Sequence, residues 1–101
     1  MEVRKKLQLG RPKGSKTFEP THALAFGEVI REQRLLVKMS QEELSHLAGV
    51  ERSHMGKIER GEHVPNLVLI FRLASALSVK PGLLVDQAYL KVVDLTLQSQ
   101  T

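Results

Sequence analysis

A 22-residue stretch from Ser40 to Gly61 constrains the fold of this 101-residue chain more than any other feature. Its sequence, SQEELSHLAGVERSHMGKIERG, reads as a short helix, a glycine and a second short helix. Ser40 is placed to cap the first helix, while Glu43, three positions later, can reach back to the cap N–H group. Gly49 lies where that helix must stop, and glycine enters the positive-φ conformation needed there without steric cost. The stretch therefore predicts two short helices joined by a tight turn.

Apolar residues at helical spacing predict three further helices outside this stretch. The first is expected over about residues 25–37. A fourth is expected from Leu67 to Leu77, with Asn66 as its N-cap. A fifth would begin at Pro81, which suits the first turn of a helix, and run to about residue 88. The expected fold class is all-α, with five helices.

Residues 89–101 form a short C-terminal extension beyond the fifth helix. In it Val93, Leu95 and Leu97 alternate with polar residues, a period of two that is typical of a strand. Because an isolated strand is marginal, the extension would pair with a symmetry mate, dock on the domain, or fray. The expected organisation is a basic, flexible arm over residues 1–22, a helical domain over residues 23–88, and this extension.

The basic residues are concentrated at the N-terminus. Residues 1–16 hold six Lys or Arg and one Glu, whereas residues 17–101 hold nine basic and ten acidic residues. Such an arm, with little apolar content, is expected to stay flexible and to be attracted to a polyanion.

Within the arm, Gly10-Arg11-Pro12-Lys13-Gly14 resembles the Gly-Arg-Pro core of AT-hooks and of recombinase arms, although Leu9 replaces the arginine that begins the full AT-hook core. The resemblance implies that Arg11, Pro12 and Lys13 lie in the minor groove of DNA. The alternative is a solvated tail that is attracted only diffusely to phosphates.

Several classes of function are not supported by the composition. The chain has no cysteine, which excludes disulfides and thiolate zinc sites. The four histidines do not have the spacing of a zinc site, and no catalytic or phosphate-loop motif is present. We therefore expect no enzyme activity, no cofactor and no metal. Because there is no apolar run of 18 residues and no signal peptide, the protein is expected to be soluble and cytoplasmic.

Three short motifs identify a family. They are Ser-Gln-Glu-Glu-Leu, Ala-Gly-Val and Lys-Ile-Glu-Arg-Gly, all within the stretch from Ser40 to Gly61. These motifs resemble those of the phage-repressor and Cro-like helix-turn-helix regulators of the XRE family. The resemblance extends from Phe26 to Val79. It implies a transcriptional regulator, for example a repressor, that binds double-stranded DNA as a homodimer. The second helix of the motif would enter the major groove at each half of an inverted-repeat operator, and the fifth helix would contribute to the dimer interface.

The residues expected to face the bases lie on one side of the second helix. Successive helical residues are about 100° apart, so Arg52, Ser53, Gly56 and Lys57 share one outward arc. Arg52, near the helix start, is the first choice for a bidentate contact to guanine. Ser53 and Lys57 can reach a base or a phosphate, while Gly56 lets the helix approach closely.

A second group of residues is expected to contact phosphates and to set the docking register. Gln41 and Arg60 match family positions with that role, and Ser40 and His54 are further candidates. The alternative for His54 is that it merely borders the core. Glu51 stands where the family usually has a Ser or Thr that opens the second helix. Its carboxylate could accept from a cytosine amino group or pair with a nearby arginine.

Arg34 and Glu59 are expected to form a structural salt bridge, because the family pairs an arginine and a glutamate at these positions. An alternative to the plain regulator is an antitoxin-type protein, which would bind a toxin partner and regulate its own promoter.

Overall fold

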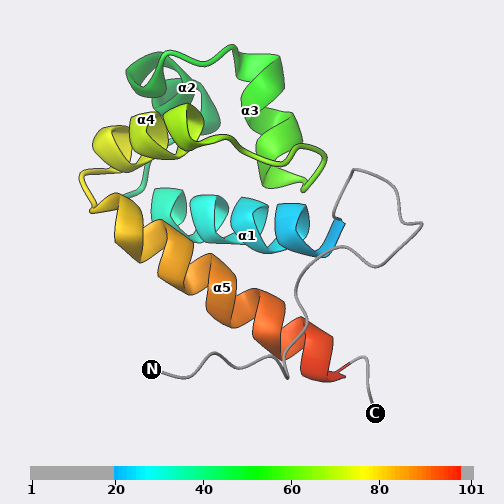
Figure 1. Cartoon of the computed structure of the whole chain (residues 1–101). Helices are drawn as coiled ribbons and strands as arrows, with labels where there is room; N and C mark the ends of the chain where they lie inside the picture. Colours follow the sequence, from blue (N-terminus) through cyan, green and yellow to red (C-terminus); the bar gives the residue numbers. More distant parts are fainter. Residues whose placement is uncertain (1–19, 99–101) are drawn as a thin grey trace.

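The computed structural model describes residues 20–98, which form five α-helices and no strand. They are α1 (Pro20–Leu36), α2 (Gln41–Ala48), α3 (Arg52–Glu59), α4 (Leu67–Leu77) and α5 (Pro81–Gln98) (Figure 1). The expected all-α fold with five helices is confirmed. Helix α1 begins at Pro20, earlier than expected, so the last three residues assigned to the basic arm are helical. The rest of the arm, including Arg11, Pro12 and Lys13, lies outside the described residues.

The predicted C-terminal strand is wrong, because α5 continues as a helix to Gln98. Val92 is buried, and Lys91 forms ion pairs with Glu28 at 3.2 Å and Glu32 at 2.9 Å, both on α1. Leu84, which is fully buried, precedes Lys91 and Val92 by seven and eight residues. This is the spacing of one face of a helix, not the alternation of a strand. Packing against α1 therefore outweighs the local period of two.

Helix α1 forms the centre of the molecule. It lies between α5 on one side and the group of α2, α3 and α4 on the other (Figure 1). Seven large side chains from all five helices are fully buried in the core: Val29, Ile30, Leu44, Met55, Ile58, Leu73 and Leu84. No single helix within residues 20–98 has both the length and the apolar character of a membrane span. Taken together, α4 and α5 have that length and composition, with a bend of 111° between them.

Local hydrogen bonds fix the helix boundaries that the sequence predicts. The Ser40 hydroxyl accepts the Glu43 N–H at 3.0 Å, and Asn66 Oδ1 accepts the Leu69 N–H at 2.8 Å. Gly49 has a φ of 70°, the left-handed conformation expected at the end of α2. These caps define the turn that leads into α3.

A glycine on α1 allows the C-terminal end of α3 to pack closely. A Cβ atom at Gly27 would clash with the carbonyl oxygen of Ile58 and would lie 2.8 Å from that of Glu59. Both obstacles are backbone atoms, so they cannot move aside independently of α3. The absence of a side chain at Gly27 thus sets how α3 sits on α1.

Candidate nucleic-acid interface

Helix α3 has one buried face and one exposed face. Met55 and Ile58 are fully buried in the core. Arg52, Ser53 and Lys57, on the opposite arc, are exposed. Because α3 has only eight residues, its orientation depends on these two core contacts and on its neighbours rather than on helix propensity.

Gly56 lies on the same side of α3 as Arg52 but is itself buried, beneath two arginine side chains. A Cβ atom built there would be 2.9 Å from Arg60 Nη1 and 3.7 Å from Arg52 Nη1. Both guanidinium groups therefore lie over the same point of the helix. With Lys57 on the next part of the arc, they give this surface a positive charge, which suits an anionic partner.

The ion pair expected between Arg34 and Glu59 is present. Arg34 Nε donates to Glu59 Oε2 at 2.7 Å and Nη2 donates to Oε1 at 2.9 Å, while Nη1 donates to the Met39 carbonyl at 2.8 Å. Gln41 Nε2 donates to the same carboxylate at 2.8 Å. The carboxylate of Glu59 thus joins α1, α2 and α3.

Glu59 remains ionised despite its burial. Burial raises the pKa of Glu59, but hydrogen bonds from Arg34 and Gln41, together with the positive charges of Arg34 and Arg31, outweigh it and leave the pKa below its usual value. The hydrogen bond to Glu59 raises the pKa of Arg34. The pair is therefore charged on both sides at neutral pH.

The four residues expected to bind phosphates differ in their surroundings. The Ser40 hydroxyl caps α2, and one amide N–H of Gln41 is directed to Glu59, which leaves the second N–H of that amide for another acceptor. Arg60 is exposed and paired with Glu62, with Nε at 2.9 Å from Oε2. This bond lowers the pKa of Glu62. Arg60 would have to exchange Glu62 for a phosphate.

His54, the fourth of these residues, packs against His63 in the loop between α3 and α4. The two ring centroids are 4.7 Å apart and the ring planes are inclined at 86°. Both rings line a hollow that also includes Arg72 of α4 and Glu51. His63 and Arg72 were not predicted as site residues, because no local spacing connects them to α3.

Glu51 precedes α3 in an extended conformation and makes no side-chain capping bond. Within residues 20–98 it forms no ion pair with Arg52 or another arginine. The predicted pairing with an arginine is therefore absent from the described residues, whereas acceptance from a cytosine amino group stays a prediction. In the same part of the chain, no group of three or more His, Asp or Glu side chains could hold a metal ion.

Comparisons with known proteins place these features in a wider group. A family model described as helix-turn-helix matches residues 30–84, more than half of the chain. An uncharacterized HTH-type transcriptional regulator of Bacillus subtilis, YgzD, is 37% identical over 51 residues, which cover 50% of this chain and 77% of that protein.

Solved structures with the same fold include regulators of restriction-modification systems. The controller protein C.AhdI from Aeromonas hydrophila is 42% identical with a TM-score of 0.60, over 61% of this chain and 94% of that one. The controller protein C.Esp1396I, solved as a tetramer with its natural 35 base-pair operator, has a TM-score of 0.67. At 20% identity, over 74% of this chain and 99% of that one, it shows likeness of fold alone.

Proposed function

We propose that this chain, which belongs to the XRE-type helix-turn-helix family of DNA-binding transcription regulators, reads an inverted-repeat operator as a homodimer. The family is not a family of enzymes. The observation that carries this proposal is the exposed cationic face of α3. There the guanidinium groups of Arg52 and Arg60 lie over Gly56, opposite the buried anchors of the helix.

The exposed arc of α3 is suited to the major groove. Arg52 occupies the first turn of the helix, from which recognition helices contact base edges. A guanidinium group there can donate to both O6 and N7 of guanine. Ser53 and Lys57 extend the contact along the groove, and Gly56 removes the side chain that would hold the helix away from the bases.

Side chains around α3 supply the contacts to the DNA backbone. The outward arc of Arg52, Ser53, Gly56 and Lys57 is called the reading face below. It is flanked by Gln41 and Ser40 at the start of α2 and by Arg60 after α3, as expected of residues that contact phosphates. His54 adds a donor close to the start of α3. In the arm, Arg11, Pro12 and Lys13 would add minor-groove contacts, which require no further folding of the domain.

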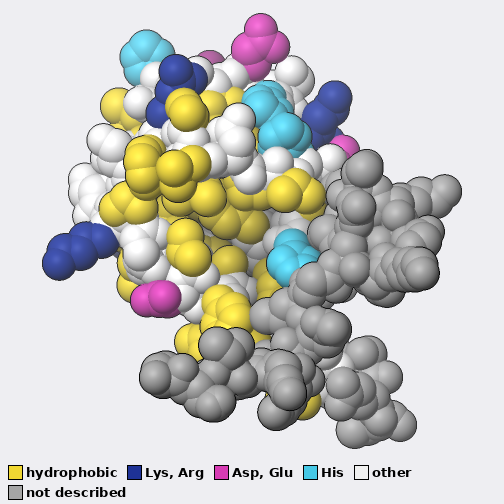
Figure 2. Space-filling view, viewed as in Figure 1, with side chains coloured by type: hydrophobic (Ala, Val, Ile, Leu, Met, Phe, Trp, Pro, Cys, Tyr) yellow, Lys and Arg dark blue, Asp and Glu magenta, His cyan; other side chains and the backbone are white. Residues whose placement is uncertain are grey.

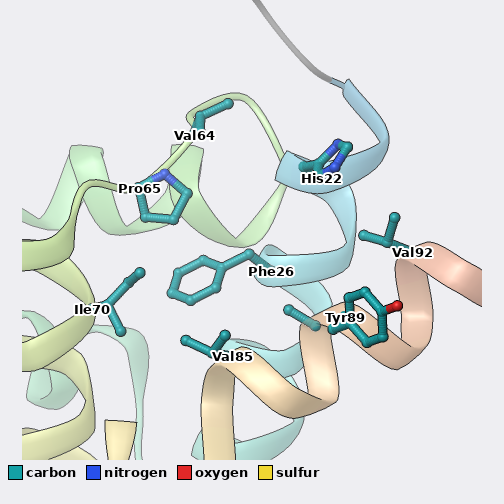
Figure 3. A pocket seen from close by; sticks show the side chains of 9 residues that line it. His22, Phe26, Val64, Pro65, Ile70, Val85, Tyr89 and Val92 are labelled. Atoms are coloured by element: carbon teal, nitrogen blue, oxygen red, sulfur yellow. The ribbon is translucent and has the colours of Figure 1, made fainter. Parts of the chain in front are cut away.

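An apolar face on α4 and α5 supports the homodimer. Figure 2 shows hydrophobic side chains gathered where these two helices meet. The face contains a hollow of about 260 Å³ with Phe26 at its base and Ile70, Val85 and Tyr89 around it (Figure 3). Phe71, on the adjoining arc of α4, is 52% exposed. A surface of this kind that is not covered is unusual in a monomer.

A second copy of the chain is the occupant that this face suits. The face has both a protruding aromatic side chain, Phe71, and an apolar hollow beside Ile70, so two copies related by a two-fold axis can exchange the same contact in both directions. The same axis would present two α3 helices to successive major grooves of an inverted repeat.

The oligomeric state tests this assignment. Phe71→Glu places a charge on the apolar face without touching the core, and sedimentation should show a shift from dimer to monomer. Leu36→Glu, at a side chain 72% exposed at the C-terminal end of α1 and outside the lining of the hollow, is the control and should remain dimeric. A Phe71→Glu protein that stays dimeric would show that the dimer interface does not include this apolar face.

Selection of bound sequences from a random duplex pool tests the proposed function as a whole. The expected product is an inverted repeat, with a guanine whose recognition depends on Arg52. Arg52→Ala should lose about 1–3 kcal/mol of preference for the selected site over random duplex. Lys80→Ala, an exposed cation at the start of α5, should keep that preference. If Arg52→Ala binds both duplexes with the wild-type ratio, Arg52 does not read a base.

The antitoxin-type alternative keeps one supporting observation. Leu90 and Leu97 of α5 remain exposed in the part of the chain that the structure describes, and they are available to a protein partner. Co-purification of a small partner in a one-to-one ratio would favour that function, whereas a lone homodimer that shifts a palindromic duplex favours the regulator.

A further inference from the structure

Two histidines next to the proposed reading face touch each other. His54 projects from the first turn of α3, two residues after Arg52, and His63 belongs to the loop that follows α3. Their ring centroids are 4.7 Å apart in an edge-to-face contact, and both residues are partly buried. An imidazolium edge over the face of a neutral ring is favourable, whereas two imidazolium ions at this distance repel each other. A second positive charge beside His63 is therefore unfavourable at this distance.

The hollow beside this pair is lined by groups that can bind an anion. It has a volume of about 370 Å³ and is formed between the start of α3, the loop after it, and α4. His54, His63 and Arg72 contribute donor groups to its wall, and Arg72 forms no ion pair within residues 20–98. The hollow is large enough for one phosphodiester group, whose oxygens can accept from these three donors, and Glu51 also lines it.

We propose that His54, His63 and Arg72 bind one backbone phosphate of the DNA, and that His63 takes up a proton when this phosphate arrives. The inference rests on the proposed function, because the phosphate belongs to the duplex that α3 reads. Proton uptake follows from electrostatics, since an anion beside an imidazole favours its charged form.

The groups that surround the pair agree with this direction. Burial, then the neighbouring His54 and Lys57, lower the pKa of His63, so the free protein is short of full protonation near neutral pH. Glu51 favours protonation but is present in both states, and Glu62, next to His63, is neutralised by Arg60. The arriving phosphate is the charge that changes.

The pH dependence of DNA binding tests the proposal. The dissociation constant for the selected duplex is measured from pH 8 to pH 6 at constant ionic strength. Uptake of up to one proton predicts an affinity that rises as the pH falls, by at most about tenfold per pH unit. His63→Gln should remove most of this rise, so that its affinity changes little between pH 8 and pH 6. His46→Gln, an exposed histidine on α2, should keep the rise.

Two further measurements test the proposal without relying on a variant at His63. In the wild-type protein, the ring resonances of His63 should titrate at higher pH with duplex bound than without it. Arg72→Gln should weaken binding to all duplexes and reduce the slope of log affinity against log salt by about one.

Equal pH dependence in wild type and His63→Gln would overturn the proposal while leaving DNA binding intact. Inorganic phosphate alone, titrated into the free protein, separates the two sources of the anion. If it shifts the His63 resonances and the duplex does not, the site does not serve the DNA backbone. If no duplex binds at any pH, the proposed function fails and this inference fails with it.

Discussion

Replacement of Glu59 by glutamine should strongly destabilise the domain. The side chains of Arg34 and Glu59 are only 11% and 3% exposed, and two short hydrogen bonds join them. Glutamine keeps the size of the side chain but removes its charge and one of its two acceptor oxygens. Arg34 is then left buried with a charge that nothing neutralises.

The size of the loss follows from the burial of the pair. Removing one partner of a buried ion pair costs about 3–5 kcal/mol, because the other charge remains without compensation. For a domain of this length, 1 kcal/mol shifts the melting temperature by about 4–8 °C. Even the lower figure of about 3 kcal/mol therefore predicts a fall of about 12–24 °C.

A double-mutant cycle with thermal and urea unfolding checks this estimate. Glu59→Gln, Arg34→Met and the double variant are compared, and the double variant should cost clearly less than the sum of the two single ones, because it leaves no unpaired charge. Glu62→Gln, which breaks an exposed pair with Arg60, is the matched control and should melt like wild type. A Glu59→Gln protein that melts like wild type would falsify the reasoning.

The same pair predicts the response to acid. The pKa of Glu59 is lower in the folded protein than its ordinary value of 4.5. The stability it contributes is therefore complete above pH 4.5 and is lost as the pH falls toward the lower, folded value. In wild type, unfolding free energy should drop below pH 4.5, and Glu59→Gln should remove part of that dependence.

Three other substitutions separate packing, approach to DNA and charge. Gly27→Ala should cost about 1–3 kcal/mol in urea unfolding, because its Cβ atom meets carbonyl oxygens of α3, whereas Gly82→Ala, with nothing within 4 Å, should not destabilise the domain. Gly56→Ala should gain up to about 1 kcal/mol of helix stability yet bind the selected duplex more weakly, and equal binding would show that α3 does not approach closely there. Glu62→Gln frees Arg60 for phosphate, so the affinity measured by titration should rise and become more sensitive to salt, and an unchanged affinity would exclude Arg60 as a contact.

The elements that sequence predicts well here depend on local interactions. The caps formed by Ser40 and Asn66, and the left-handed Gly49, involve residues at most three apart or a single backbone angle. Likewise, the outward arc of α3 follows from helical geometry alone. Such features are determined by residues close together in the sequence, so they can be predicted without the tertiary structure.

The features that sequence missed depend on contacts between distant residues. The end of α5 alternates like a strand, and only the burial of Val92 and the pairing of Lys91 with α1 make it helical. In the same way, His54 meets His63 only because the loop after α3 folds back beside the helix. Neither contact has a signal in spacing or composition.

The accuracy of the reading face depends on the residues behind it. Helix α3 is short and follows Glu51, which gives it no side-chain cap, so α3 cannot hold its own position. Its C-terminal end is held instead at Glu59, by Arg34 of α1 and Gln41 of α2, and by the close packing at Gly27. Because these contacts exist before any ligand arrives, little conformational entropy would be lost when α3 enters a groove. Substitutions behind α3 should therefore weaken DNA binding even where no residue that touches DNA has changed.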